Sequence, residues 1–90
     1  MIYTLEKEYD YHGCQLIIAT DSLNLCVDAA NAIESFPYCG DYLVFRTWKD
    51  DKCFAVSTIP GQRHDYRTDI ETPVTFEEVM KNMKLVQKEV

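Results

Sequence analysis

Apolar residues in this chain switch between two spacings, and the order of those switches constrains the fold more than any single motif. Alternating, β-branched or aromatic residues, which are typical of strands, occupy four segments: 2–11, 14–20, 42–48 and 53–59. Apolar residues recur every three or four positions, as on one face of a helix, from 23 to 33 and from 76 to 90. The predicted order of elements is therefore ββαββα.

The start of each predicted helix carries a capping residue. Asp21 or Ser22 can cap the first helix, because a side-chain oxygen there accepts from an unpaired N–H of the first turn. Pro37 cannot continue this helix. Thr75 and Glu78 have the spacing of a capping box ahead of the last helix. Polar turn sequences separate the strands of each pair, which predicts two hairpins.

Two hairpins and two helices predict one α+β domain over residues 1–90. The hairpins can join into a four-stranded, mainly antiparallel sheet with both helices packed on one of its faces. A chain of 90 residues is too short for two independent cores. Residues 62–73 are polar and mixed in charge, which predicts a loop between the fourth strand and the last helix.

Short apolar runs indicate the cellular location of such a chain, and the spacing of its cysteines bears on metal binding. Runs such as Leu16–Ala19 are far below the roughly 18 residues that span a bilayer, and the first residues do not resemble a secretory signal. We therefore expect a cytoplasmic protein without membrane contact. No C-x-x-C pair is present, so we expect neither a metal site nor a cofactor. We expect Cys14, Cys26, Cys39 and Cys53 to be free thiols, most of them packed inside the fold.

The net charge of −6 belongs to the first half of the chain. Residues 1–45 hold seven acidic side chains against Lys7 alone, whereas residues 46–90 hold eight acidic and eight basic side chains. This distribution disfavours direct binding to nucleic acid or to an anionic membrane. It favours a partner protein with a basic surface.

A row of carboxylates in the first predicted strand is the leading candidate for a partner-binding surface. Glu6, Glu8 and Asp10 occupy every second position, so they point to one side with about 6.6 Å between neighbours. Tyr9 and Tyr11 can add contact area at the rim. Two acids of the first helix extend this surface if helix and strand face the same way: Asp21 and Asp28. A simpler interpretation is the solvated face of an edge strand, where charge prevents aggregation.

The polar 62–71 segment allows a different interpretation. Arg63, His64 and Arg67 can grip a phosphate or a carboxylate, because arginine offers a planar fork of donors. Local pairing of opposite charges explains the same residues without a ligand. The sequence contains no glycine-rich phosphate loop, metal-ligand spacing or nucleophile motif, so it does not support an enzyme.

A short, acidic α+β chain without catalytic motifs resembles, in general type, the small inhibitors that phages and mobile elements direct against host nucleases, such as anti-CRISPR and anti-restriction proteins. The likeness implies a non-catalytic inhibitor that occupies the basic, nucleic-acid-binding surface of a partner protein. The alternative is a structural or regulatory subunit that self-associates as a homodimer, through an edge strand or through the helix with Met80 and Met83.

Overall fold

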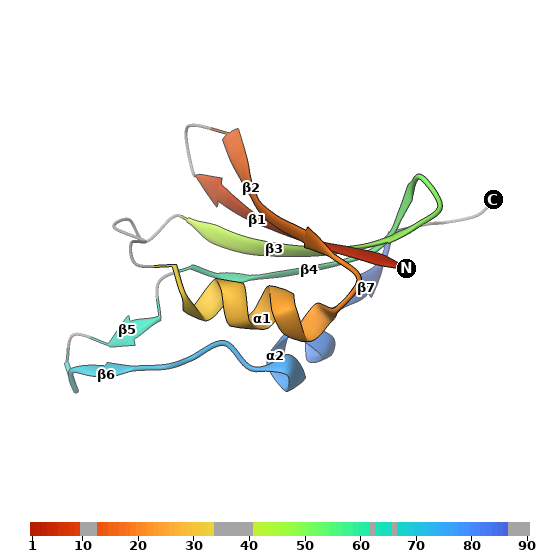
Figure 1. Cartoon of the computed structure of the whole chain (residues 1–90). Helices are drawn as coiled ribbons and strands as arrows, with labels where there is room; N and C mark the ends of the chain where they lie inside the picture. Colours follow the sequence, from red (N-terminus) through yellow and green to blue (C-terminus); the bar gives the residue numbers. More distant parts are fainter. Residues whose placement is uncertain (10–12, 34–40, 62, 66, 87–90) are drawn as a thin grey trace.

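A five-stranded antiparallel sheet with two helices on one face forms the body of the protein in the computed structural model (Figure 1). The structure describes residues 1–9, 13–33, 41–61, 63–65 and 67–86. The strand order is β2-β1-β3-β4-β7, with bounds β1 Ile2–Tyr9, β2 Gly13–Thr20, β3 Tyr42–Lys49, β4 Lys52–Pro60 and β7 Lys84–Leu85. The helices are α1 Leu23–Asn31 and α2 Phe76–Lys81.

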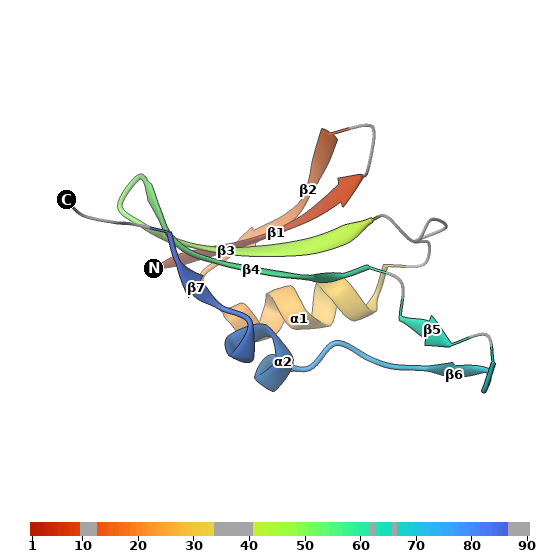
Figure 2. The ribbon, with the colours of Figure 1, turned by 180° about the vertical axis from the view of Figure 1, so that it is seen from behind.

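The predicted α+β class and the packing of both helices on one face are confirmed (Figures 1 and 2). The sheet has one strand more than the sequence predicts, because β7 pairs with β4 at the end of the sheet. The first strand is also not an edge strand, since β1 lies between β2 and β3 and pairs antiparallel with both. The edge-strand interpretation of its carboxylates therefore does not fit this sheet.

The connection through α1 accounts for the central position of β1. From the end of β2 the chain crosses the face of β1 and β2 as α1, and it enters β3 on the far side of β1. Gly13 opens β2 with a φ of +82°, a left-handed conformation that glycine adopts without steric cost. Ser22 caps α1, because its Oγ accepts from the backbone N–H of Leu25 at 3.4 Å.

The core lies between the helices and the sheet. Leu5, Phe45 and Ile59, on three neighbouring strands, are at most 1% exposed. Cys26 of α1 and Val79 of α2 reach the same core and have no exposed surface. Burial of this continuous apolar cluster is the main term that stabilises the fold. Within the described ranges, neither helix is long and apolar enough to cross a bilayer.

The last helix is much shorter than its apolar period predicts. The spacing from 76 to 90 predicts one continuous helix, but α2 ends at Lys81. Asn82 follows as the C-cap, and its side-chain amide donates to the carbonyl of Glu78 at 2.9 Å. The chain then extends and pairs with β4 as β7. Backbone bonds to an open sheet edge outweigh the weak helical preference of a short terminal segment. Residues 87–90 lie outside the described part of the chain.

The segment predicted as a loop before α2 contains a small hairpin. β5 His64–Asp65 pairs with β6 Ile70–Glu71 in a two-stranded sheet that is separate from the main one. Asp69 adopts a φ of 58° before β6, a conformation that aspartate tolerates in turns. The hairpin extends away from the main sheet on the side of the helices (Figures 1 and 2).

Candidate functional site

An open apolar groove of about 440 Å³ lies between the two helices, at the end of the sheet where β1 begins and β3 turns into β4. The start of α1 forms one wall, α2 forms the other, and residues of β1, β3, β4 and β7 form the floor. Twelve residues line it: Met1, Tyr3, Asp21, Leu23, Asn24, Thr47, Phe54, Ala55, Phe76, Met80, Met83 and Leu85.

All three methionines of the chain line this groove, which we call the Met groove. Met1 and Met80 are 60% and 47% exposed, and Phe54 and Phe76 are exposed beside them. Contiguous apolar surface of this kind marks interaction sites more often than ordinary surface. Flexible thioether side chains also adapt to apolar partners of different shape. The groove therefore has the composition of a protein-binding surface.

Buried and partly buried contacts fix α2 as one wall of the Met groove. The carbonyl of Val79 accepts from the Ser57 hydroxyl at 2.8 Å, inside the core. The Asn31 side chain donates to the carbonyl of Val74 at 2.9 Å and accepts from the Val74 N–H at 2.8 Å. These bonds tie α2 to β4 and to the end of α1. A helix of six residues needs such anchors, because it is too short to be stable alone.

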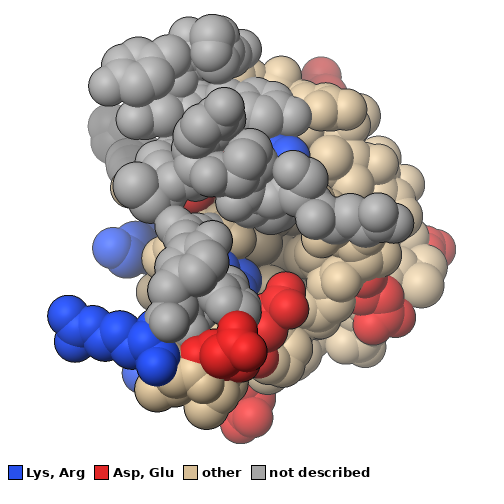
Figure 3. All heavy atoms as spheres, turned by 90° about the vertical axis from the view of Figure 1, so that its left-hand side faces the viewer, with Lys and Arg blue, Asp and Glu red and all other residues tan. Residues whose placement is uncertain are grey.

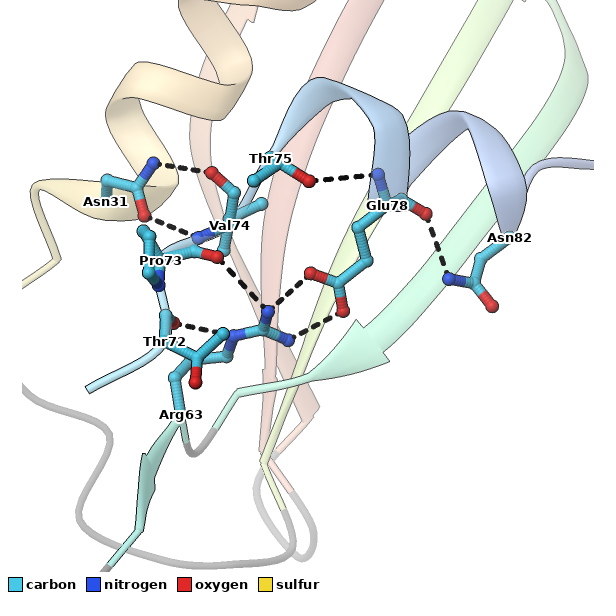
Figure 4. Close-up of polar contacts among 8 residues, drawn as sticks. All are labelled: Asn31, Arg63, Thr72, Pro73, Val74, Thr75, Glu78 and Asn82. Atoms are coloured by element: carbon cyan, nitrogen blue, oxygen red, sulfur yellow. Dashed lines mark hydrogen bonds and ion pairs between the residues drawn. The ribbon is translucent and has the colours of Figure 1, made fainter. Parts of the chain in front are cut away.

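An arginine holds the segment ahead of α2 (Figure 4). The Arg63 guanidinium pairs with both carboxylate oxygens of Glu78, at 2.9 Å for Nη1, and donates to the carbonyls of Thr72 at 3.2 Å and Pro73 at 3.3 Å. Thr75 caps α2, since its Oγ1 accepts from the Glu78 N–H at 3.1 Å. The predicted N-cap is thus confirmed, while the Glu78 carboxylate binds arginine. These bonds occupy the guanidinium fork that the sequence offers to a phosphate or carboxylate ligand.

Two of the predicted partner-binding acids lie beside the Met groove. Asp21 lines the groove and is the only charged side chain among its twelve lining residues. Asn24 also lines it, and Asp28 follows one turn later on the same side of α1. Both aspartates are exposed to solvent. We call this pair, Asp21 and Asp28, the acidic bank of the groove.

The predicted carboxylate row of β1 faces away from the helices. Glu6 lies 3.3 Å from the Nε of Arg46, and its side chain is only 17% exposed. Burial acts to lower the pKa of Arg46, but its hydrogen bond with Cys53 and the charge of Glu6 raise this pKa above its ordinary value. Glu8 is exposed on the same face of the sheet. The charge of Glu6 is therefore partly neutralised, whereas Glu8 is open to solvent.

The structure does not bring the seven predicted binding residues together on one surface. Glu6 and Glu8 lie on the face of the sheet without helices, whereas Asp21 and Asp28 belong to the helix layer on the other face. Asp10 and Tyr11 lie outside the described residues, and so does the side chain of Tyr9. The acidic residues of β1 and those of the helix layer therefore do not form a single acidic face.

The end of the molecule with the β5–β6 hairpin carries charges of both signs (Figure 3). Acidic and basic side chains lie beside one another there, and neutral side chains separate further acids. Arg67, Asp69 and Glu71 are exposed residues of this hairpin and its turn. Charges of alternating sign partly cancel at a distance, so the described charges of this hairpin produce a weak field. The side chain of His64 lies outside the described part of the chain.

The three described cysteines have different environments but are all free thiols. Cys14 is exposed, Cys53 is intermediate and Cys26 is buried. Within the described ranges, no group of three or more His, Cys, Asp or Glu side chains is placed to hold a metal ion. Cys39 lies outside these ranges.

Cys26 makes the fold sensitive to alkali. Its side chain is fully buried, and burial raises the pKa of the thiol above the ordinary value of 9.0. Well below pH 9.0 the thiol is neutral in both states, whereas near and above pH 9.0 it ionises more in the unfolded chain than in the folded one, so the free energy of unfolding falls. We expect urea denaturation between about pH 8 and about pH 10.5 to show a steeper loss in the wild type than in Cys26→Ala. Parallel pH profiles for the two proteins would contradict this.

The Met groove and its acidic bank are defined by the chemistry and position of their own residues. They combine an apolar surface, a wall that buried and partly buried hydrogen bonds hold in place, and acidic side chains along one side. Neither a protein-family model, nor a curated protein, nor a solved structure matches this chain.

Proposed function

We propose that this chain is a small, acidic, non-catalytic binding protein that attaches to a basic surface of a partner protein through the Met groove and its acidic bank. Where the basic surface is the nucleic-acid-binding site of an enzyme, attachment inhibits that enzyme. One observation carries the proposal: three methionines and exposed phenylalanines surround a groove whose only charged side chain is Asp21.

Charge and composition support this role in different ways. The net charge of −6 favours encounter with a basic partner and raises the association rate. The apolar lining adds burial to the contact, and the exposed Asp21 and Asn24 at the start of α1 supply polar groups on one wall. Free thiols at Cys14, Cys26 and Cys53 support a cytoplasmic location, where thiols stay reduced.

The variant Met80→Lys tests the groove directly. Met80 is 47% exposed in α2, so the change leaves the core intact but puts a charge on an apolar wall. Burying that charge at an interface is unfavourable, and we expect binding to weaken about tenfold or more. The measurement is recovery of the partner in a pull-down from host lysate. Ile70→Lys in β6 is the matched control, since Ile70 is 58% exposed outside the groove. Undiminished recovery with Met80→Lys would rule the groove out.

A second candidate surface is the carboxylate row of β1, and the exposure of Glu8 favours it. Glu6 already pairs with Arg46, so Glu8 supplies most of the available charge in the described part of this row. The variant Glu8→Lys in the same pull-down distinguishes the two surfaces. Loss of the partner with Glu8→Lys and its retention with Met80→Lys would assign binding to the β1 row, as a nucleic-acid mimic requires.

A further inference from the structure

We infer that the Met groove binds an amphipathic helix of the partner, whose apolar face is bordered by lysine or arginine. This inference rests on the proposed function and adds the shape and charge of the bound segment. Both walls of the groove are formed by helices, and residues of the sheet form its floor. Figure 2 shows the two helices on the same face of the sheet. The groove is thus an opening between two helices of one layer, and a further helix can pack across this opening with one apolar face.

The size of the groove admits side chains but not a whole helix. Its volume of about 440 Å³ is typical of a pocket for a small ligand. A helix with its side chains is about 10 Å across, so it lies over the opening and inserts one apolar face. Apolar anchors at positions i, i+3, i+4 and i+7 suit this arrangement. Exposed Met1, Phe76 and Met80 then contact the helix from the rim.

The acidic bank borders the groove at two points beside α1. Asp21 precedes Ser22, the N-cap of α1, and Asp28 lies in the second turn of the helix. Basic residues along one flank of a partner helix that runs beside α1 can therefore reach both aspartates.

The same charges oppose two other occupants of the groove. A second copy of this chain brings another acidic bank and another net charge of −6 to the interface, and like charges repel there. A fatty acid or a phospholipid brings an anionic group close to Asp21. A helix with an apolar face and basic flanks satisfies both the lining and the acidic bank.

Methionine-methyl NMR tests the inference, because all three methionines line the groove. The protein carries ¹³C in its methionine methyl groups and is titrated with two designed helical peptides of identical leucine pattern. One peptide has lysine along the flanks of its apolar face, and the other has glutamate there. We expect the lysine peptide to shift the methionine signals and to bind about tenfold more tightly than the glutamate peptide.

A double charge-reversal variant, Asp21→Lys with Asp28→Lys, provides the matched comparison. Both residues are exposed, so the core is unchanged, and circular dichroism verifies the helix content. We expect the order of the two peptide affinities to reverse in this variant. Equal binding of both peptides by the wild type would overturn the charge preference and leave the groove as the binding surface.

The other occupants have their own signatures in the same spectra. Methionine signals that shift with protein concentration alone would identify a second copy, and signals that respond to sodium laurate and to neither peptide would identify a lipid. Either result overturns the helix inference. Signals that respond to none of these additions would overturn it as well, and the Met80→Lys pull-down then decides independently whether the groove binds a partner at all.

Discussion

Replacement of Phe45 by alanine is expected to lower the free energy of unfolding by about 3–5 kcal/mol. The Phe45 side chain has no exposed surface, and it lies opposite Leu5 of β1 and Ser57 of β4 at the centre of the sheet. Removal of the ring leaves a cavity that close-packed neighbours fill only in part. For a domain of this size a loss of about 3 kcal/mol lowers the melting temperature by about 12 °C or more, which calorimetry measures directly.

The matched control for this prediction lies on the same strand. Tyr42 is also aromatic and also in β3, but it is 42% exposed. We expect Tyr42→Ala to cost less than about 1 kcal/mol, because a smaller area returns to water and no closed cavity forms. Equal losses for the two variants would show that aromatic content of the strand, rather than burial, determines the stability of this sheet.

The variant Arg63→Ala is expected to cost about 1–3 kcal/mol and to loosen the chain between β6 and α2. It removes the ion pair with Glu78 and two hydrogen bonds to backbone carbonyls, those of Thr72 and Pro73. The two charged side chains are 15% and 29% exposed, so water compensates part of the loss and the cost stays below that of a fully buried pair. Urea denaturation measures the stability. Hydrogen exchange at the Thr72 N–H, which donates to the Arg63 carbonyl, reports the local loosening.

A lysine variant separates the geometry of the Arg63 side chain from its charge, and a variant of another exposed base serves as the control. Arg63→Lys keeps the positive charge, but an ammonium group cannot bind a carboxylate and two carbonyls as a planar fork does. We therefore expect lysine to restore less than half of the lost stability. Lys81→Ala removes an exposed charge from α2, the helix of Glu78, and we expect a change within about 0.5 kcal/mol. Full rescue by lysine would mean that the fork geometry is unimportant.

Local patterns predicted the parts of the fold that depend on local physics. The four long strands and α1 lie within a few residues of their predicted positions, because each has its own periodicity and its own turn or cap. Ser22 and Thr75 both cap helices as their residue types and positions indicate. Burial of alternate residues in β1 and β4 also follows from the period of a strand, as Leu5 and Ile59 demonstrate.

Features that depend on distant residues did not emerge from these patterns. The apolar spacing of residues 76–90 fits a helix, and only the open edge of β4 explains why the chain extends into β7. Arg63 and Glu78 are fifteen residues apart, and each has several alternative partners in the sequence. The Met groove collects residues from six elements, so the periodicity of Met80 and Met83 predicts a buried stripe and does not reveal that packing leaves one side open.

Because every methionine lines the Met groove, oxidation of methionine would change the polarity of this groove. Peroxide converts a thioether to a sulfoxide, which is polar and which reductases can reverse. Met1 and Met80 are among the exposed side chains, whereas the thiol of the core, that of Cys26, belongs to a side chain without exposed surface. Mild oxidation would therefore make the groove polar while the sheet stays folded, and repair would restore it.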